Sequence, residues 1–317
     1  MVKRLKFLYA FYNFFHKNQL AHNIPIYKKL GLNKRYYSPV SSKDFKNVRV
    51  SIQKNDKYPD LKDTSIFKNA GEDTRQSIAD FEKDGFAILK QYLSPEQVAT
   101  INNEIDNLLQ AKKIHFGHGN KIMFAIHRSD ILKAFGTDPK LIELLSSLLQ
   151  GPTALFQSIN FMMGSEQHTH SDSIHMTTYP LGGLLGVWMA LEDIDEDNGP
   201  LHYYPGSHKL PYYLNSDYDN EGSYFLLGDK DYTKYEKMLE EKVIEHGIEK
   251  KIFKAKKGDL LIWHANLLHG GEPHINKSKT RKSMVFHYFN TDCVCYHEIT
   301  QRPSLISKWL KDQEKSK

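Results

Sequence analysis

His170 and Asp172 place an imidazole and a carboxylate two residues apart in the segment HTHSD (168–172). Side chains at this spacing on an extended segment point to the same face, so both groups can reach one metal ion. A second imidazole follows much later in the chain, at His269. Two histidines and one aspartate are the ligand set of non-haem iron(II) oxygenases, which keep positions open for dioxygen and a bidentate 2-oxo acid. A structural zinc site would instead be closed by a fourth protein ligand.

A guanidinium and an indole are the expected contacts for the 2-oxo acid. Arg281 follows His269, and on an adjacent strand it could clamp the distal carboxylate of 2-oxoglutarate through two parallel hydrogen bonds. Trp188 would form a wall against the same cosubstrate. The expected cofactors are therefore iron(II), 2-oxoglutarate and dioxygen (O2).

The elements that must position these groups are short strands. Apolar runs broken by turn residues occupy 153–161, 186–191, 201–204, 260–264 and 283–288. Runs of this length, mostly without helices between them, predict an antiparallel barrel or sandwich, which would bring His269 beside the first pair. Helices precede the strands. The segment SPEQ (94–97) predicts a capped helix that continues to Ala111, and a second apolar helix follows Asp138 and ends before Gly151.

Charge is unevenly distributed along the chain. Residues 1–43 carry nine Lys or Arg and no Asp or Glu, whereas the rest holds 34 basic and 38 acidic side chains. This acidic body argues against a nucleic-acid-binding protein. The aromatic run 5–15 is far shorter than the ~20 residues that span a bilayer. Either its Phe and Tyr side chains pack on the body or on a partner subunit, or residues 1–35 lie peripherally on an anionic membrane surface.

We expect three parts in the chain: a basic arm and linker (1–72), an oxygenase domain (73–300) and a C-terminal tail (301–317). The polar stretch 38–75 predicts little regular structure. A charged, tyrosine-rich insertion at 211–250, helical near 232–243, is expected to lie over the mouth of the barrel as a lid. Cys293 and Cys295 are too close to staple a fold, and a reducing, cytoplasmic location is expected.

An ordered set of motifs across about residues 78–290 resembles the phytanoyl-CoA dioxygenase family of iron(II)/2-oxoglutarate oxygenases. The matching pieces are FEKDGF (81–86) with the helix after Ser94, HSD (170–172), Trp188 with ALED (190–193), NGPL (198–201), PGSH (205–208), KGD (257–259), and His269 with Arg281. The resemblance implies a mainly β protein with flanking helices and a double-stranded β-helix (jelly-roll, cupin-like) core. It implies His170, Asp172 and His269 as iron ligands, and Arg281 and Trp188 as cosubstrate contacts.

The same resemblance implies two further contacts and a preference between reactions. Lys121 is the candidate for a lysine that often touches 2-oxoglutarate in this family, and Gln157 would face cosubstrate or substrate. Relatives often carry a serine two residues after the distal histidine, where this chain has Gly271. Related halogenases replace the metal-binding carboxylate with a small residue so that chloride can bind iron. The presence of Asp172 therefore favours oxygen transfer.

The leading hypothesis is a 2-oxoglutarate-dependent hydroxylase acting on an unactivated C–H bond of a small-molecule or lipid- or carrier-linked substrate. One alternative is a non-catalytic barrel that binds metal or ligand and is recruited by its basic arm. Another is desaturation, ring closure or epimerisation at the same iron. Substrate specificity is expected from residues 212–250 and 115–127. His168, His175 and His208 are expected to support the site or the fold, and Trp263 and His264 to belong to the core.

Overall fold

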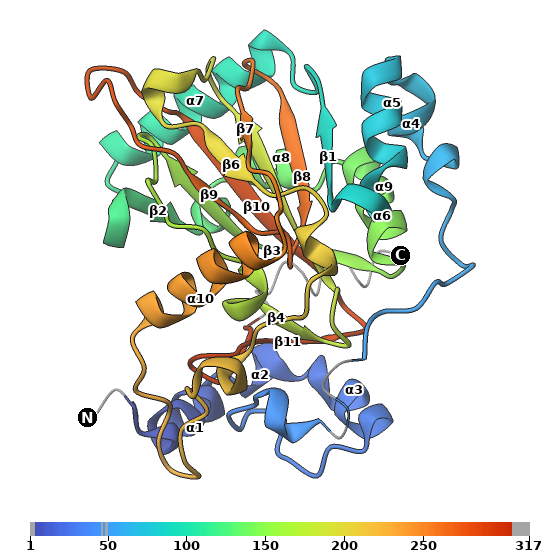
Figure 1. The fold of residues 1–317 in the computed structure, drawn as a ribbon, viewed down its shortest axis with the longest axis vertical. Coiled ribbons are helices and arrows are strands. Elements are labelled where there is room, and N and C mark those ends of the chain that lie inside the picture. Colours follow the sequence, from blue (N-terminus) through green and yellow to red (C-terminus); the bar gives the residue numbers. More distant parts are fainter. Residues whose placement is uncertain (1–3, 46, 48–49, 306–317) are drawn as a thin grey trace.

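The computed structural model describes residues 4–45, 47 and 50–305, and its centre is a six-stranded sheet (Figure 1). In spatial order its strands are β1 (Phe86–Leu89), β8 (Leu260–His264), β5 (Leu184–Ala190), β10 (Ser283–Asn290), β3 (Thr153–Phe161) and β2 (Lys121–Met123). One three-stranded sheet contains β7 (Lys251–Phe253), β6 (Leu201–Tyr203) and β9 (His269–Gly271), and another contains β12 (Arg302–Pro303), β11 (Val294–His297) and β4 (Thr177–Tyr179). Neighbouring strands pair antiparallel throughout these sheets.

Two-residue alternation sorts the side chains of the large sheet between its two faces. On β10, Met284 and Phe286 pack against the helical layer, whereas Val285 and His287 face the interior of the barrel. The same alternation on β8 turns Trp263 inward, where it joins a cluster with residues of β6 and β7. The sequence therefore places one apolar layer under the helices and a second layer between the sheets.

Helices cover the outer face of the large sheet. They are α4 (Ser65–Asn69), α5 (Glu72–Ala79), α6 (Phe81–Asp84), α7 (Pro95–Gln110), α8 (Asp130–Gly136) and α9 (Pro139–Leu149). The predicted capping box of α7 is present, since Ser94 Oγ accepts from the Gln97 amide and Gln97 Oε1 accepts from the Ser94 amide. Short 3-10 turns connect elements at Ser42–Asp44, Leu61–Asp63, His118–Asn120, Ala125–His127, Asp172–Ile174, Glu196–Asn198, Ser207–Lys209 and Asn215–Tyr218.

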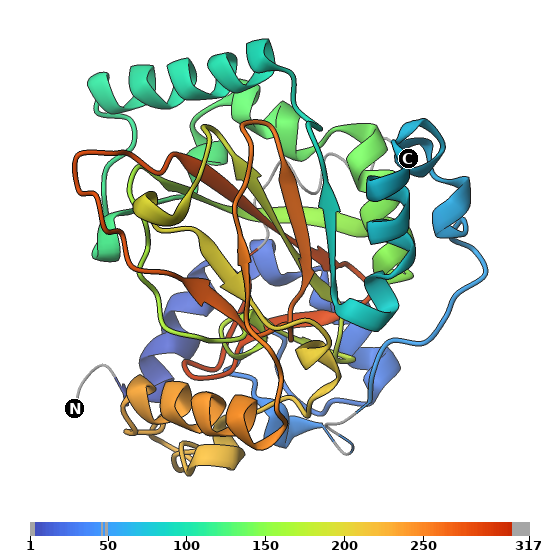
Figure 2. The ribbon, with the colours of Figure 1, turned by 45° about the horizontal axis from the view of Figure 1, so that its top comes forward.

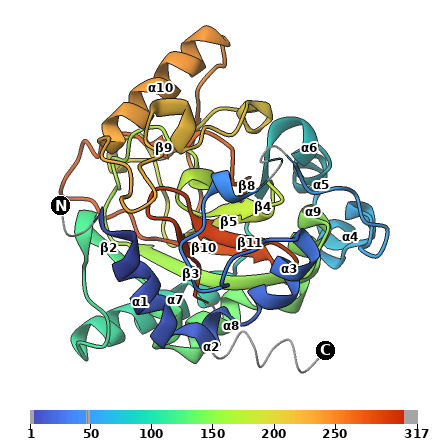
Figure 3. The same ribbon diagram turned by 90° about the horizontal axis from the view of Figure 1, so that it is seen from below.

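The N-terminal arm forms α1 (Lys6–Phe15), α2 (Lys17–Leu20) and α3 (Asn23–Leu30), which lie at the end of the barrel near β4 and β11 (Figure 3). Tyr27 and Phe45 pack against Tyr179 and Tyr296, so this later part of the arm packs on the body. The aromatic side chains of α1 behave differently, because its buried residue is Asn13, whose amide donates to the Tyr37 carbonyl. Among the described residues, no helix is long and apolar enough to cross a membrane.

The stretch expected to be an unstructured linker is more ordered than its composition indicates. Two short helices, α4 and the start of α5, lie within 38–75, and Ile66 of α4 belongs to the main core. A few separate apolar side chains hold this polar segment against the core. Because they do not recur at helical spacing, the sequence contains no periodic signal of the helices. Of the expected tail, residues 301–305 are described and 306–317 lie outside the described residues.

The insertion at 211–250 contains α10 (Tyr232–Glu245), close to the helical stretch expected there. Figure 2 shows α10 and α7 at opposite ends of the barrel. Tyr235 and Leu239 of α10 pack against Ile174 and Leu268, which flank the candidate metal-binding residues in the sequence. The insertion therefore rests directly on the segments that carry the site.

Candidate metal and cosubstrate site

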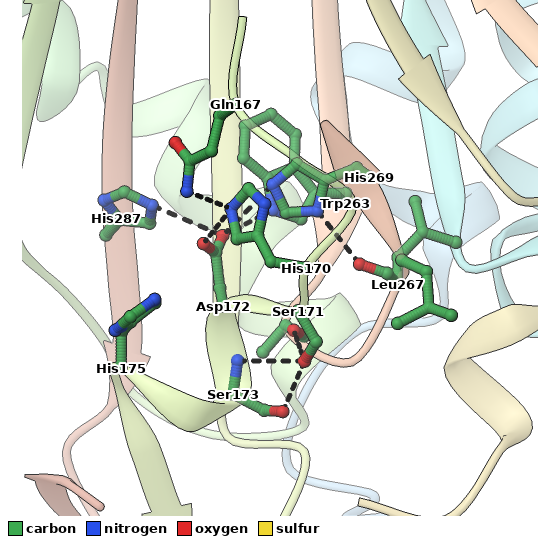
Figure 4. Close-up of polar contacts among 12 residues, drawn as sticks. Gln167, His170, Ser171, Asp172, Ser173, His175, Trp263, Leu267, His269 and His287 are labelled. Atoms are coloured by element: carbon green, nitrogen blue, oxygen red, sulfur yellow. Dashed lines mark hydrogen bonds and ion pairs between the residues drawn. The ribbon is translucent and has the colours of Figure 1, made fainter. Parts of the chain in front are cut away.

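Backbone pairing brings the two histidine segments together. His170 and His269 form an isolated antiparallel bridge, in which the amide of each donates to the carbonyl of the other at 2.9 Å. Asp172 then begins a 3-10 turn that Ser171 caps, with the Ser171 hydroxyl accepting from the Ser173 amide and donating to the Ala265 carbonyl. This turn directs the carboxylate back toward the imidazoles (Figure 4).

The three polar groups of His170, Asp172 and His269 converge. One ligand atom from each of His170, Asp172 and His269 lies within 4.8 Å of the other two, and all three residues are buried. The Asp172 carboxylate oxygens are 3.8 Å from His170 Nε2 and 3.9 Å from His269 Nε2. Two imidazoles and one carboxylate suit a divalent transition metal such as iron(II).

Hydrogen bonds on the far side of each ring orient both imidazoles. His170 Nδ1 lies 2.9 Å from the His168 carbonyl, and His269 Nδ1 lies 2.9 Å from the Leu267 carbonyl. Because a carbonyl only accepts, each Nδ1 carries the hydrogen and each Nε2 keeps its lone pair for a metal. Burial also lowers the pKa of His170 well below its ordinary value, which keeps this imidazole neutral and able to bind.

Asp172 is held as a carboxylate by its neighbours. Burial raises its pKa, but its interactions with the neighbouring imidazoles of His269 and His287 outweigh burial and lower it strongly. Trp263 Nε1 donates to Asp172 Oδ2 at 2.7 Å, and His287 Nε2 lies 3.4 Å from the same oxygen. Sequence reasoning assigned Trp263 to the core and did not single out His287. Both side chains point into the barrel from a strand, and this can be recognised only when the strand register is known.

Arg281 lies buried at the other side of the same cavity. Its Nη1 donates to Ser283 Oγ at 2.6 Å, while its Nε has no partner, and no acidic side chain of the described residues lies within ion-pair distance. Burial lowers its pKa to about 10, so the guanidinium is still charged at neutral pH. The rings of Phe161 and Trp188 flank it, with centroids 5.2 and 5.9 Å from Cζ. A buried, unpaired guanidinium is costly unless an anion completes it, and the carboxylate of 2-oxoglutarate fits this requirement.

The other expected cosubstrate contacts also line this cavity. Trp188 has an indole N–H that meets no hydrogen-bond partner among the residues that the structure describes. Lys121 Nζ donates to Gln167 Oε1 at 2.9 Å, and burial lowers its pKa. Gln157 lies opposite His287 in the register of β3 and β10. Gln167, which sequence reasoning missed, places its amide 3.1 Å from His170 Nε2, so a metal on that nitrogen would displace the amide.

Gly271 lies where relatives often have serine, and Ser165 fills the space that a side chain at position 271 would occupy. A Cβ at Gly271 would lie 2.6 Å from Ser165 Oγ. That hydroxyl is 3.5 Å from Arg281 Nη2. The hydroxyl that this chain lacks at 271 is therefore provided near the guanidinium by Ser165.

The cavity has a volume of about 360 Å³ and reaches from Arg281 past the metal-binding residues to a wall of further imidazoles. His175 and His297 belong to this wall, and burial lowers their pKa values to about 4 and about 3. His175 Nε2 lies 2.9 Å from the hydroxyl of Tyr232, the first residue of α10. This contact between Tyr232 and His175 supports the prediction that the insertion contributes to the substrate pocket.

The remaining residues that the sequence marked lie outside the cavity. His168 is exposed and lies 3.8 Å from Glu240, and His208 Nε2 lies 3.1 Å from the Glu82 carbonyl. Cys293 and Cys295 are buried free thiols, and burial raises the pKa of both. His168 meets the triad through its backbone carbonyl, which accepts from His170 Nδ1, while its side chain points to Glu240.

Comparison with known proteins agrees with a site for a metal and a 2-oxo acid. A family model described as phytanoyl-CoA dioxygenase matches residues 81–283. A Dictyostelium discoideum protein named phytanoyl-CoA dioxygenase domain-containing protein 1 homolog is 23% identical over 275 residues, covering 69% of this chain and 92% of that protein.

Two solved structures share the fold. One is a non-haem α-ketoglutarate-dependent carbocyclase, SnoK from nogalamycin biosynthesis, with a TM-score of 0.59 and 15% identity over 78% of this chain and 93% of that one. The other is EctD from Sphingopyxis alaskensis with 2-oxoglutarate and 5-hydroxyectoine, with a TM-score of 0.54 and 22% identity over 76% of this chain and 82% of that one. The similarity of fold confirms the predicted jelly-roll core.

Proposed function

This chain belongs to the phytanoyl-CoA dioxygenase family of 2-oxoglutarate-dependent oxygenases, and we propose that it hydroxylates an unactivated C–H bond of a small-molecule or lipid- or carrier-linked substrate. Its cofactors are iron(II) and 2-oxoglutarate, with dioxygen as the oxidant. The observation that carries the proposal is the pairing of a complete His170–Asp172–His269 triad with an unpaired buried guanidinium in one cavity.

The residues of this chain divide the work of binding. His170, Asp172 and His269 would hold the iron, with Trp263 fixing the orientation of the carboxylate. Arg281, supported by Ser283, would take the distal carboxylate of 2-oxoglutarate, beside the unpaired indole N–H of Trp188. We assign Lys121 and Gln157 to the cavity wall that faces cosubstrate or substrate.

When bound, iron and 2-oxoglutarate supply with dioxygen an oxidant strong enough to remove hydrogen from an unactivated C–H bond. The protein positions the reacting carbon and excludes water from the cavity. Asp172 would serve as the metal-binding carboxylate that related halogenases lack, which favours transfer of oxygen to the substrate. On the substrate side, the neutral imidazoles of His175 and His297 and the thioether of Met176 offer hydrogen bonds and apolar contact but no fixed charge.

Two alternatives predict different products or none. The carbocyclase of similar fold makes ring closure at the same kind of iron a serious second candidate, and desaturation and epimerisation belong to the same class. A non-catalytic barrel is disfavoured by the intact triad and by the buried Arg281 guanidinium, which no acidic side chain of the described residues pairs.

The test is a screen of candidate substrates with the iron(II)-loaded full chain, 2-oxoglutarate and ¹⁸O-labelled dioxygen, followed by mass spectrometry. Hydroxylation adds one labelled oxygen atom to the product and one to succinate. Desaturation or ring closure instead removes two hydrogens, and epimerisation leaves the mass unchanged. Absence of succinate release under all conditions would favour the non-catalytic alternative.

A further inference from the structure

Helix α1 turns an aromatic stripe outward. Phe7, Phe11 and Phe15 follow one another at helical spacing, and their exposed fractions are 62%, 64% and 67%. Tyr12 and Phe14 beside them are 49% and 44% exposed. Folded chains in water rarely leave so many large apolar side chains together on one element unless something covers them.

A loop of the insertion extends this surface. The Lys6 amide donates to the Phe225 carbonyl at 3.0 Å, and the Leu227 amide donates to the Arg4 carbonyl at 2.8 Å. The side chains of Tyr224 and Phe225 in this loop are 87% and 71% exposed. Figure 1 shows the loop beside α1, at the end of the molecule away from α7. We call α1 together with Tyr224 and Phe225 the aromatic surface.

The charges around the aromatic surface identify its partner. The segment 4–20 carries Arg4, Lys6 and Lys17 and no acidic residue. Arg4 is paired with Asp229 of the insertion at 3.3 Å, but exposed Lys17 beside α1 has no acidic side chain within ion-pair distance among the described residues. The same holds for exposed Lys28 and Lys29 on α3, farther along the arm. The adjoining insertion segment 217–231 carries five acidic side chains and one Lys. The eight Lys or Arg of residues 4–43 still leave the two segments together with an excess of positive charge, which a second copy would repeat and which opposes self-association. A partner with negative charge at its surface and apolar groups beneath it would match both the cations of the arm and the exposed aromatic rings.

We propose that the aromatic surface docks on an anionic lipid membrane. The phenyl rings would enter the boundary between headgroups and acyl chains, while the cations of the arm remain among the headgroups. Docking of this kind needs no membrane-spanning helix. It is independent of the proposed reaction, because none of the residues of this surface lines the cavity of the metal site.

The insertion connects this surface to the cavity. Residues 224 and 225 precede α10 closely, and the first residue of α10, Tyr232, meets His175 in the cavity wall. A docked molecule would therefore hold its lid segment next to the lipid. This arrangement suits a substrate that is drawn from the membrane.

The experiment is co-sedimentation of the full chain with vesicles of phosphatidylcholine alone or mixed with phosphatidylserine. We expect binding to the mixed vesicles that weakens as salt is raised. Phe7→Ser with Phe11→Ser should lower the partition coefficient at least about tenfold, because two exposed rings lose their apolar burial. Ile252→Ser with Ile275→Ser removes two exposed apolar side chains elsewhere, and this control should bind as the unaltered chain does.

Circular dichroism and size-exclusion chromatography complete the test. Both double variants should keep the helical signal and elution volume of the unaltered chain, since all four side chains are exposed. Failure of the unaltered chain to bind mixed vesicles, or equal binding by the Phe7/Phe11 variant, overturns the proposal. A dimer that this variant converts to a monomer, without vesicle binding, would assign the surface to a second copy and also overturn it.

Discussion

The indole N–H of Trp263 donates to the Asp172 carboxylate across 2.7 Å, from a strand of the large sheet to the turn that carries the metal-binding aspartate. Hydrogen bonds to a ligating carboxylate fix its orientation, and their loss weakens metal binding. The relationship joins the packing of the barrel to the chemistry of the site.

Replacing Trp263 with Phe keeps the ring in the core but removes this hydrogen bond. We expect iron(II) or cobalt(II) affinity, measured by anaerobic calorimetry, to fall by about tenfold or more. Tyr288→Phe is the matched control, because it removes a buried hydroxyl that donates to the Gly136 carbonyl at 2.9 Å, away from the site. Equal losses of metal affinity in the two variants would contradict a specific role for Trp263.

Gly186 of β5 has no side chain, and this leaves room for the Trp263 ring to pack against the strand. A Cβ at this position would lie 2.3 Å from the ring, so Gly186→Ala forces the indole or the strand to move. We expect a loss of about 1–3 kcal/mol in the free energy of unfolding, measured with urea, together with weaker metal binding. At Gly71 a Cβ would meet no atom of the described residues within 4 Å, and Gly71→Ala should change stability by less than about 1 kcal/mol. Full stability of the Gly186→Ala protein would refute the packing argument.

Ser165 and Gly271 should behave as a coupled pair near Arg281. Ser165→Ala is expected to raise the dissociation constant of 2-oxoglutarate by about threefold to tenfold, as the loss of one hydrogen bond predicts. Gly271→Ser alone should be worse, because its Cβ collides with Ser165 Oγ. The double variant should recover affinity relative to Gly271→Ser, which a calorimetric double-mutant cycle would measure. Strictly additive effects would show that the two positions do not share the space.

Stability should fall as the solution becomes acidic. Burial, with a smaller contribution from His208, lowers the pKa of His264 to about 3. The unfolded imidazole takes up a proton below its ordinary pKa near 6.5, whereas the folded one excludes it, so the stabilisation present above pH 6.5 is lost between about 6.5 and 3. The slope from one such group reaches about 1.4 kcal/mol per pH unit.

Urea unfolding at several pH values between 7.5 and 4.5 measures this slope. His264→Gln should flatten it, and exposed His246→Gln should leave it as in the unaltered chain. A slope that His264→Gln leaves unchanged would show that this imidazole is not the group that resists protonation.

Local patterns in the sequence predicted much of the site. The two-residue spacing placed His170 and Asp172 on one face, and the short apolar runs predicted a barrel that would bring His269 beside them. Trp263 and His287 could not be found in this way, because their contact with Asp172 depends on which strands pair and in what register. The role of Ser165 could not be predicted for a similar reason, since it occupies the space beside Gly271, which is far from it in the sequence. The order in residues 38–75 was missed because single apolar anchors such as Ile66 carry no period.

The central claim is that two imidazoles and a carboxylate hold iron(II) while Arg281 presents 2-oxoglutarate to it. The most direct measurement is an anaerobic titration of the iron(II)-loaded full chain with 2-oxoglutarate, followed by visible absorption. We predict a charge-transfer band of a metal-chelated 2-oxo acid that saturates at one equivalent, is lost in Asp172→Ala and requires a higher concentration of 2-oxoglutarate in Arg281→Lys. Absence of the band in the unaltered chain, or an identical titration with Asp172→Ala, would contradict the account.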